Sequence, residues 1–283
     1  MRKKWMSVSF MLFVISALVL AACGGGSGNG NGNGNSAAGG ESEAGASLLD
    51  EIKSRDKLVV GVKFDTKLFG LKDPASGEVE GFDIDIAKAL AKSILGDENK
   101  IELKEVTSKT RIPMLNNNEI DMIIATMTIT EERREQVDFS EVYFEAGQSL
   151  LVKKGSPIQS VEDVTSGTKV LAVKGATSVD NIKEIAPDAT VLEFENYQDA
   201  FSALKAGQGD VLTTDNSILY GMMAQDANYE VVGEPFTDEP YGIAMKKGET
   251  ALVEAVNEGL AALKSSGEYN TIYEKWIGEA PSE

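Results

Sequence analysis

The sequence predicts an α/β fold, because short β-branched runs alternate with helical patterns along most of its length. Residues 58–62 are typical of a buried strand, and residues 83–95 carry apolar side chains at the three- and four-residue spacing of a helix. The same alternation resumes after residue 148. About 235 residues, from position 47 to the end, are available for this fold, which is enough for one large domain or two modest ones.

The N-terminus has the pattern of a secretory signal. Residues 1–4 read Met-Arg-Lys-Lys, and a short apolar run then extends to Ala22. This run is shorter than the apolar stretch that a transmembrane helix usually needs to cross a bilayer. It ends in Leu-Ala-Ala-Cys at residues 20–23, which resembles the bacterial lipobox, where cleavage leaves the cysteine as a lipid-bearing N-terminus. We therefore predict a signal peptide at residues 1–22 and lipidation of Cys23; the alternative is an ordinary signal with an incidental cysteine.

Residues 23–47 are predicted to form a flexible linker that begins at the lipidated cysteine. They are nearly all Gly, Asn, Ser, Ala and Glu, and such a segment cannot bury enough apolar surface to offset the entropy of ordering it. A tether at this position would let a globular head move above a membrane. Cys23 is the only cysteine in the chain, so we expect no disulfide in the mature protein.

The composition narrows the range of functions. The chain has 45 acidic and 27 basic residues and a formal net charge of −18, which is poorly suited to nucleic acid or to anionic lipid surfaces. It has no histidine, which excludes Ser-His-Asp and Cys-His catalysis and the usual His-containing zinc sites. It also lacks the Gly-x-x-x-x-Gly-Lys-Ser/Thr phosphate loop. We expect no cofactor and no metal, although a carboxylate pair or a lysine could still support an enzyme.

The first half of the head begins with the strand at 58–62 and the helix at 83–95. Asp83 and Asp85 fall in the first turn of this helix, where the positive end of the helix dipole favours carboxylates, and we interpret both as dipole-matching charges. Residues 101–106 and 122–125 are predicted strands, and residues 111–116 a short helix. Thr130 followed by two glutamates is typical of a helix start.

The second half continues the alternation. Strands are predicted at residues 149–152, 170–173, 191–194, 211–213 and 241–245, with helices near Val179 and at 197–206. The C-terminal region is helical. It carries one apolar stripe of Leu252, Val256, Leu260 and Leu263 and, after Gly267, a second of Tyr269, Ile272, Tyr273 and Trp276. We interpret the aromatic stripe as packing and not as a binding surface.

Four motifs follow one another along the chain, and the likeness that they carry extends over residues 50–278. The helix at 83–95 is introduced by Gly-Phe-Asp-Ile-Asp-Ile at 81–86; residues 128–133 read Thr-Ile-Thr-Glu-Glu-Arg and are followed by Val-Asp-Phe-Ser at 137–140. Residues 241–244 read Tyr-Gly-Ile-Ala, and the chain closes on the spaced aromatic residues at 269, 273 and 276. Together these motifs resemble the family-3 bacterial solute-binding proteins, the polar-amino-acid receptors. Residues 107–113 (Thr-Ser-Lys-Thr-Arg-Ile-Pro) resemble the glutamate, aspartate and glutamine branch in particular.

The resemblance implies a two-lobed clamshell of the periplasmic-binding-protein-like type II class. Each lobe would be a mixed sheet flanked by helices, and the chain would cross between the lobes twice. By this likeness lobe 1 comprises residues 48–144 plus 240–283, and lobe 2 comprises residues 148–236. The crossings would lie near Glu145 and near residues 238–240.

The resemblance also implies a site for a free amino acid. Both the carboxylate and the ammonium of such a ligand are costly to bury without a partner. Arg133 matches the motif position that would bind the carboxylate through a planar guanidinium fork, with a hydroxyl from Thr128 and a backbone group from Thr126. Asp215 matches the carboxylate of lobe 2 that would bind the ammonium. Thr177, at a Gly-Ala-Thr-Ser turn that opens a helix, would belong to an anion-binding cradle.

The ligand side chain is assigned by a second set of matches. Lys63, Ser108 and Arg111 match positions that surround the distal carboxylate in acidic-amino-acid receptors of the family. Two cations would suit glutamate or aspartate, so we expect glutamate to bind more tightly than glutamine. Thr66 and Ser108 stand where receptors for glutamine or for cationic amino acids often carry Phe or Tyr. This difference disfavours arginine and lysine as ligands, and glutamine to a smaller extent.

The function implied is that of a lipid-anchored substrate-binding protein of an amino-acid ABC importer, and not an enzyme. Its partners would be a free amino acid, a membrane permease and paired ATPase subunits, with the membrane reached through the lipid. We expect a monomer on the extracytoplasmic face of the cell membrane of a Gram-positive bacterium. Two alternatives remain open: a dehydratase acting on cyclohexadienyl substrates, which shares the fold, and a ligand-sensing module.

Overall fold

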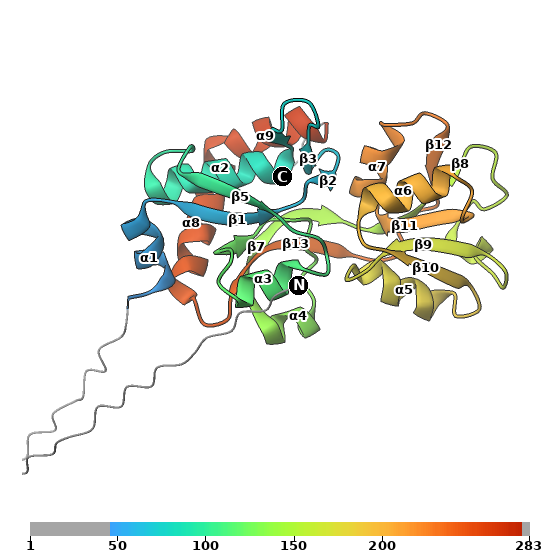
Figure 1. Ribbon diagram of the computed structural model, residues 1–283, viewed down its shortest axis with the longest axis horizontal. Coiled ribbons are helices and arrows are strands. Elements are labelled where there is room, and N and C mark those ends of the chain that lie inside the picture. Colours follow the sequence, from blue (N-terminus) through green and yellow to red (C-terminus); the bar gives the residue numbers. More distant parts are fainter. Residues whose placement is uncertain (1–45, 279–283) are drawn as a thin grey trace, which may run out of the picture. The chain divides into compact units, whose positions relative to one another are not determined.

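The structure is a computed structural model that describes residues 46–278 (Figure 1). The predicted signal peptide, the lipidation site Cys23 and nearly all of the linker lie outside these residues. Within them, no helix combines the length and apolar character needed to cross a membrane. Most of the described strands form two separate five-stranded sheets, and helices flank each sheet. This arrangement confirms the predicted two-lobed α/β fold class.

The first lobe is built on the sheet ordered β5-β1-β6-β13-β7. Strand β1 pairs in parallel with β5 and β6, and β13 pairs antiparallel with β6 and β7, so the sheet is mixed. A small antiparallel sheet, β2-β3-β4, completes the lobe. Its elements are α1 (Leu48–Arg55), β1 (Leu58–Val62), β2 (Asp65–Thr66), β3 (Gly70–Lys72), β4 (Val79–Glu80), α2 (Phe82–Leu95), β5 (Ile101–Glu105), α3 (Arg111–Asn116), β6 (Met122–Ile123), α4 (Glu131–Gln136), β7 (Val137–Ala146), β13 (Glu239–Lys246), α8 (Thr250–Ser266) and α9 (Glu268–Trp276).

The second lobe is built on the sheet ordered β10-β9-β11-β8-β12. Strand β9 pairs in parallel with β10 and β11, whereas β8 pairs antiparallel with β11 and β12. Its elements are β8 (Gln148–Lys153), the 3-10 helix η1 (Val161–Asp163), β9 (Lys169–Val173), α5 (Thr177–Ile185), β10 (Thr190–Phe194), α6 (Tyr197–Lys205), β11 (Val211–Asp215), α7 (Asn216–Met223) and β12 (Tyr229–Val232). The precise boundaries between lobes stay a prediction.

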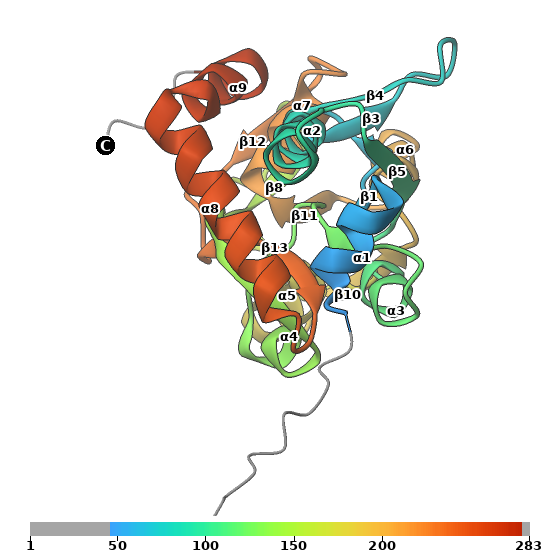
Figure 2. The same ribbon diagram turned by 90° about the vertical axis from the view of Figure 1, so that its left-hand side faces the viewer.

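The core of the first lobe contains an aromatic cluster. Phe82, at the start of α2, packs edge-on against Phe69, Tyr269 and Tyr273, and Phe144 stacks on Tyr241. Helix α8 packs against α2 and β7, and α9 packs against both helices (Figure 2). The C-terminal aromatic stripe therefore packs within the lobe, as the sequence predicted.

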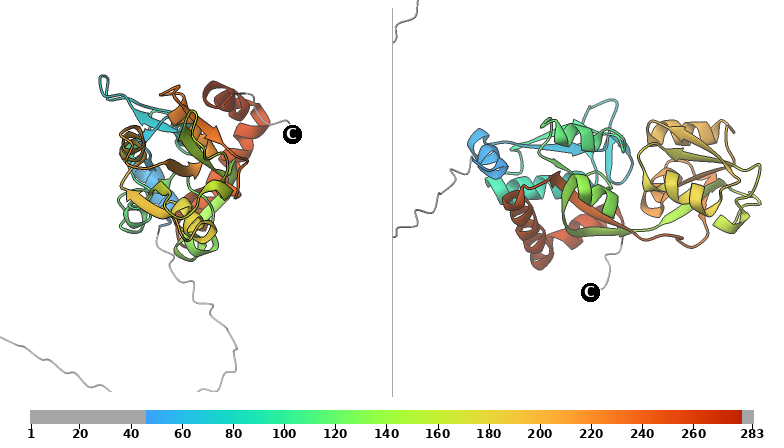
Figure 3. Two further views of the ribbon diagram at one scale, coloured as in Figure 1. Left: turned by 90° about the vertical axis from the view of Figure 1, so that its right-hand side faces the viewer. Right: turned by 90° about the horizontal axis from the view of Figure 1, so that it is seen from below.

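Two paired strands connect the lobes (Figure 3). Strand β7 leads out of the first lobe and β13 leads back, and Ala146 lies opposite Glu239 where they meet the second lobe. Gly147 follows β7 at a place without room for a side chain, because an added Cβ would come within 2.6 Å of the Thr237 carbonyl oxygen. The sequence did not predict β7, since its exposed acidic residues interrupt any β-branched run.

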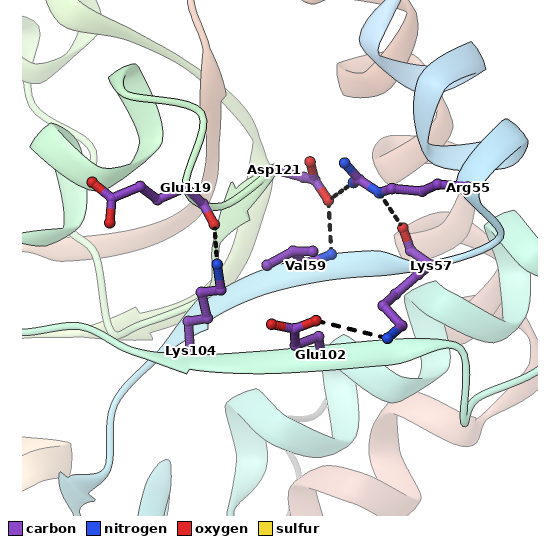
Figure 4. A network of polar contacts seen from close by, with 7 residues as sticks. All are labelled: Arg55, Lys57, Val59, Glu102, Lys104, Glu119 and Asp121. Atoms are coloured by element: carbon purple, nitrogen blue, oxygen red, sulfur yellow. Dashed lines mark hydrogen bonds and ion pairs between the residues drawn. The ribbon is translucent and has the colours of Figure 1, made fainter.

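A network of polar contacts joins α1 to the edge of the first sheet (Figure 4). Asp121, which is 4% exposed, accepts a hydrogen bond from the Val59 backbone N–H at 2.7 Å and forms an ion pair with Arg55. Arg55 also donates to the Lys57 carbonyl, and Lys104 donates to the Glu119 carbonyl. One buried carboxylate thus connects the helix before β1 with β1 itself and with the loop before β6.

We expect Asp121→Ala to destabilise the chain by about 2–3 kcal/mol, because it leaves the partly buried Val59 N–H without its acceptor and removes the ion pair with Arg55. Thermal unfolding followed by circular dichroism would show a fall in Tm of roughly 5–10 °C. The control is Glu102→Ala, which removes an exposed ion pair with Lys57 and should change Tm little. Equal Tm values for the two variants would contradict this account.

Candidate ligand-binding site

Arg133 is a buried guanidinium held at the edge of the first lobe. Thr130 caps α4 by accepting a hydrogen bond from the Arg133 N–H, which fixes the backbone from which this side chain extends. Its Nη1 donates to the Thr128 carbonyl at 2.7 Å, and its Nη2 donates to the Gly175 carbonyl of the second lobe at 3.1 Å. The side chain's burial lowers the pKa of Arg133, and the negative charge of Asp215 opposes this shift.

Lys63 is a second buried cation. It follows β1 and is 1% exposed, with its Nζ donating to the Ser108 hydroxyl at 2.9 Å. The same Nζ lies 5.1 Å from the centre of the Tyr197 ring, which comes from α6 of the second lobe. Desolvation lowers the pKa of Lys63 to about 8, against the opposing effect of the negative charge of Asp65.

Arg111, at the start of α3, is the third buried cation. Its Nη1 donates to the Ala125 carbonyl at 2.7 Å and to the Thr126 carbonyl at 3.3 Å. Its Nε is buried and has no hydrogen-bond partner among the described residues. Desolvation and the positive charge of Arg133 lower the pKa of Arg111 to about 9.

These three cations share an unusual electrostatic position. The hydrogen bonds described above go to carbonyl or hydroxyl oxygens, which satisfy donors without neutralising charge. None of the ion pairs within residues 46–278 includes Lys63, Arg111 or Arg133. Since a buried charge without an ionic partner is expensive, this arrangement favours an anionic group from outside the chain.

Asp215 brings the opposite charge from the second lobe. It ends β11, is 5% exposed, and accepts a hydrogen bond from the Tyr241 hydroxyl at 2.5 Å. Desolvation and the negative charge of Glu239 raise the pKa of Asp215 to about 7, whereas Arg133 and Arg111 act to lower it. The two arginines are therefore close enough to Asp215 for a direct electrostatic effect, although they form no ion pair with it among the described residues.

Thr126 is held in a left-handed conformation, with φ at 46°. Its N–H donates to Asp83 at 3.0 Å, and its carbonyl accepts from Arg111, so its backbone is held from both sides. Asp83 also accepts from the Tyr143 hydroxyl at 2.8 Å. A non-glycine residue with such a φ is strained, and these hydrogen bonds hold it in place.

The interpretation of Asp83 as a dipole-matching charge is therefore incomplete. Its side chain is fully buried beneath the site instead of lying on an exposed first turn, and desolvation raises its pKa to about 7. A first-turn aspartate is common in exposed helices, so the sequence contained no signal for this role. Asp85 behaves differently: it is engaged by Lys275 and by the indole N–H of Trp276.

Thr177 and Thr128 are placed by other contacts. Thr177 begins α5; its hydroxyl donates to Glu239 at 2.8 Å and accepts from Gln148. Glu239, which is 2% exposed, also accepts from Asn181 and Thr237. Thr128 is 4% exposed and forms an isolated β-bridge with Tyr241.

Glu239, Tyr241 and Tyr197 were not predicted from the sequence as residues of the site, because carboxylates and aromatic residues near strand and helix ends are common.

A groove of about 710 Å³ is lined by residues of both lobes. Arg133, Ser108 and Thr177 contribute to its lining, whereas Lys63 and Asp215 do not. The groove therefore contains only part of the predicted set of ligand-binding residues. No group of three or more potential metal-ligating side chains occurs in the described part of the chain.

Comparisons with known proteins find relatives over most of the chain. A sequence profile of the bacterial extracellular solute-binding proteins, family 3, matches residues 58–279. The chain is 61% identical over 272 residues to the ABC transporter glutamine-binding protein GlnH of Bacillus subtilis (strain 168), covering 95% of this chain and 96% of that one. It is 68% identical over 207 residues to a glutamine-binding protein of Geobacillus stearothermophilus, covering 73% and 79%.

A solved structure is similar as well. An ancestral arginine-binding protein bound to glutamine superposes with a TM-score of 0.75 at 46% sequence identity, covering 80% of this chain and 99% of that one.

The raised pKa of Asp215 makes a prediction about stability. A carboxyl with a folded-state pKa of about 7, against an ordinary 3.8, destabilises the ligand-free protein little below pH 4 and increasingly as the pH rises to 7. We therefore expect Asp215→Asn to raise the Tm of the ligand-free chain by roughly 5 °C at pH 8 and by less at pH 5. Differential scanning calorimetry at both pH values measures this, and a lower Tm at pH 8 would contradict it.

Proposed function

The chain belongs to the bacterial extracellular solute-binding proteins, family 3, and on that premise we propose that it is the substrate-binding component of an ABC importer for glutamine, with glutamate as a second ligand. It would capture the free amino acid between its lobes outside the cytoplasm and deliver it to a membrane permease driven by ATPase subunits. The names of the two similar glutamine-binding proteins support the transport role and the ligand class.

One observation carries this proposal. In the first lobe, buried cations that form no ion pair with any described residue lie within electrostatic reach of a buried carboxylate in the second lobe. A zwitterionic amino acid supplies both missing charges on adjacent groups, and it does so only when the two lobes are together. Contacts that the open form lacks are what favour closure on the ligand.

The proposed roles follow the charges. Arg133 would bind the ligand carboxylate, assisted by the Thr128 hydroxyl, the Thr126 backbone and the N-terminus of α5 at Thr177. Asp215 would accept the ammonium. Because the Thr177 hydroxyl already donates to Glu239, its contribution to the ligand would come from its backbone N–H.

Lys63, Ser108 and Arg111 would bind the far end of the ligand side chain. These groups offer hydrogen-bond donors, including the unpartnered Arg111 Nε, which suits a carbonyl or carboxylate oxygen. The oxygen of a side-chain carboxamide can accept hydrogen bonds from these groups as a carboxylate oxygen can. Because the two relatives reported above are named glutamine-binding proteins, we propose glutamine ahead of glutamate, in place of the order expected from the sequence.

The attachment of the folded part of the chain to the membrane is also part of the proposal. A lipid on Cys23 and the linker at residues 23–47 would hold the head, as a monomer, at the outer face of a Gram-positive cell membrane. An importer requires this location, because a receptor released from the surface would dilute away from its permease.

The role of Arg133 is tested by Arg133→Ala. We expect amino-acid affinity to fall at least tenfold, because the ligand carboxylate loses its charge-assisted fork. The Tm of the ligand-free chain should change little, since removing a desolvated charge offsets the two hydrogen bonds lost with it. Isothermal titration calorimetry gives the affinity. The matched control is Arg134→Ala, the exposed neighbour on the same helix, which should bind normally; unchanged binding by Arg133→Ala would refute the proposed site.

The ligand is tested by a thermal-shift panel of the twenty amino acids, followed by titration of those that raise Tm. We expect glutamine to give the largest shift and glutamate a smaller one, with arginine and lysine giving little. Mass spectrometry of the recovered ligand provides the control against an enzyme, because a binding protein returns the amino acid unchanged. A dehydrated product, or no response to any amino acid, would contradict the proposed function.

A further inference from the structure

Asp65 connects the two lobes directly. It lies in β2 of the first lobe, yet its Oδ2 accepts a hydrogen bond from the Tyr197 backbone N–H at 2.7 Å, and its carbonyl accepts from the Gln198 side chain at 2.8 Å. Both donors belong to the first turn of α6 in the second lobe. A carboxylate at this position also meets the positive end of the helix dipole. Asp65 was not among the residues predicted from the sequence.

The segment that Asp65 holds also closes the candidate site. The backbone of Tyr197 is bound to Asp65, while its ring covers the Lys63 ammonium at 5.1 Å and its hydroxyl accepts a hydrogen bond from the Thr214 hydroxyl at 3.2 Å. Tyr197 is only 3% exposed. The position of Asp65 relative to α6 therefore determines where this ring lies over the side-chain end of the site.

The two lobes also come close together at a second place, between Gly221 of the second lobe and Lys67 of the first. Gly221, within α7, faces the Lys67 carbonyl so closely that an added Cβ would come within 2.4 Å of that oxygen. The clash would be with backbone, which cannot rotate away as a flexible side chain can. Glycine lowers the stability of a helix interior, so its presence here is explained by the need for the lobes to meet.

We propose that Asp65 is a positioning residue for ligand binding, which acts by holding α6 and the Tyr197 ring against the first lobe when the lobes close. This inference rests on the proposed function. The Asp65 contacts need no ligand, so they add to the closed state whether or not an amino acid is present. Because a ligand that requires the closed state binds in proportion to how often that state is populated, losing these contacts weakens binding without removing any contact proposed above for the ligand.

The folding of each lobe should not depend on Asp65. The side chain is half-buried at the interface, and α6 keeps its own cap, because the Asn196 side chain accepts from the Asp199 N–H at 2.8 Å. A variant at position 65 should therefore unfold like the parent while binding differently. A purely structural role would instead lower Tm.

The first test is titration of the full chain with glutamine. Asp65→Ala is expected to weaken affinity about tenfold, as for a lost charge-assisted hydrogen bond, and Gln198→Ala by a smaller factor. The control is Asp73→Ala, an exposed aspartate that follows β3 and whose side chain accepts only from the nearby Ala75 and Ser76 among the described residues; it should bind as the parent does. Affinity of Asp65→Ala equal to that of Asp73→Ala would overturn the inference.

A second variant separates closure from stability. Gly221→Ala should raise or preserve the Tm of the ligand-free chain, because alanine favours a helix, while weakening glutamine binding at least tenfold through its clash with Lys67. Tighter or unchanged binding by this variant would contradict an interface that must close at this point.

Closure can also be measured without a ligand. The full chain would carry Cys23→Ser, and the exposed residues Lys92 and Gln208, one in each lobe, would each be replaced by cysteine. A pair of dyes attached to these two cysteines then reports on the distance between the lobes. Single-molecule energy transfer should show a smaller closed population after Asp65→Ala than after Asp73→Ala; equal populations would overturn the inference. If the parent binds no amino acid, the proposed function fails while this measurement still decides the role of Asp65.

Discussion

The burial of three positive charges, none of which forms an ion pair within residues 46–278, is the constraint on which the architecture of the site depends. Each of Lys63, Arg111 and Arg133 donates hydrogen bonds to neutral oxygens of the chain, which fix its position without neutralising its charge. The opposing carboxylate, Asp215, belongs to the other lobe. A chain that buries charge in this way gives up stability in the ligand-free state, because desolvation is compensated only in part.

The two strands that connect the lobes also hold the site. Tyr143 in β7 donates to Asp83, which in turn holds the strained backbone of Thr126. In β13, Tyr241 donates to Asp215 and Glu239 accepts from Thr177. Residues of both lobes are thus hydrogen-bonded to the same pair of strands, so a change in the angle between the lobes also moves the groups that position the ligand-binding residues.

The fold could largely be predicted from local patterns. The helix at Phe82–Leu95 and the strands at Leu58–Val62 and Val211–Asp215 have regular apolar spacing, since each places one or both faces in a core. Strand β7 was missed because its outward residues are acidic and its pairing with β13 is made by a segment about a hundred positions later in the chain. The cap of α4 by Thr130, which fixes the backbone of Arg133, could be predicted because the two residues are only three positions apart in the sequence.

The sequence by itself determined the class of chemistry: no histidine, one cysteine directly after an apolar run, and an ordered set of motifs that predicts an amino-acid receptor. Only the tertiary structure decided how the charges combine. Asp83 has the local sequence of an ordinary first-turn carboxylate, and nothing near Asp65 predicts that it binds a helix 132 positions away. Burial and electrostatic balance arise from segments distant in the chain, so local spacing contains no record of them.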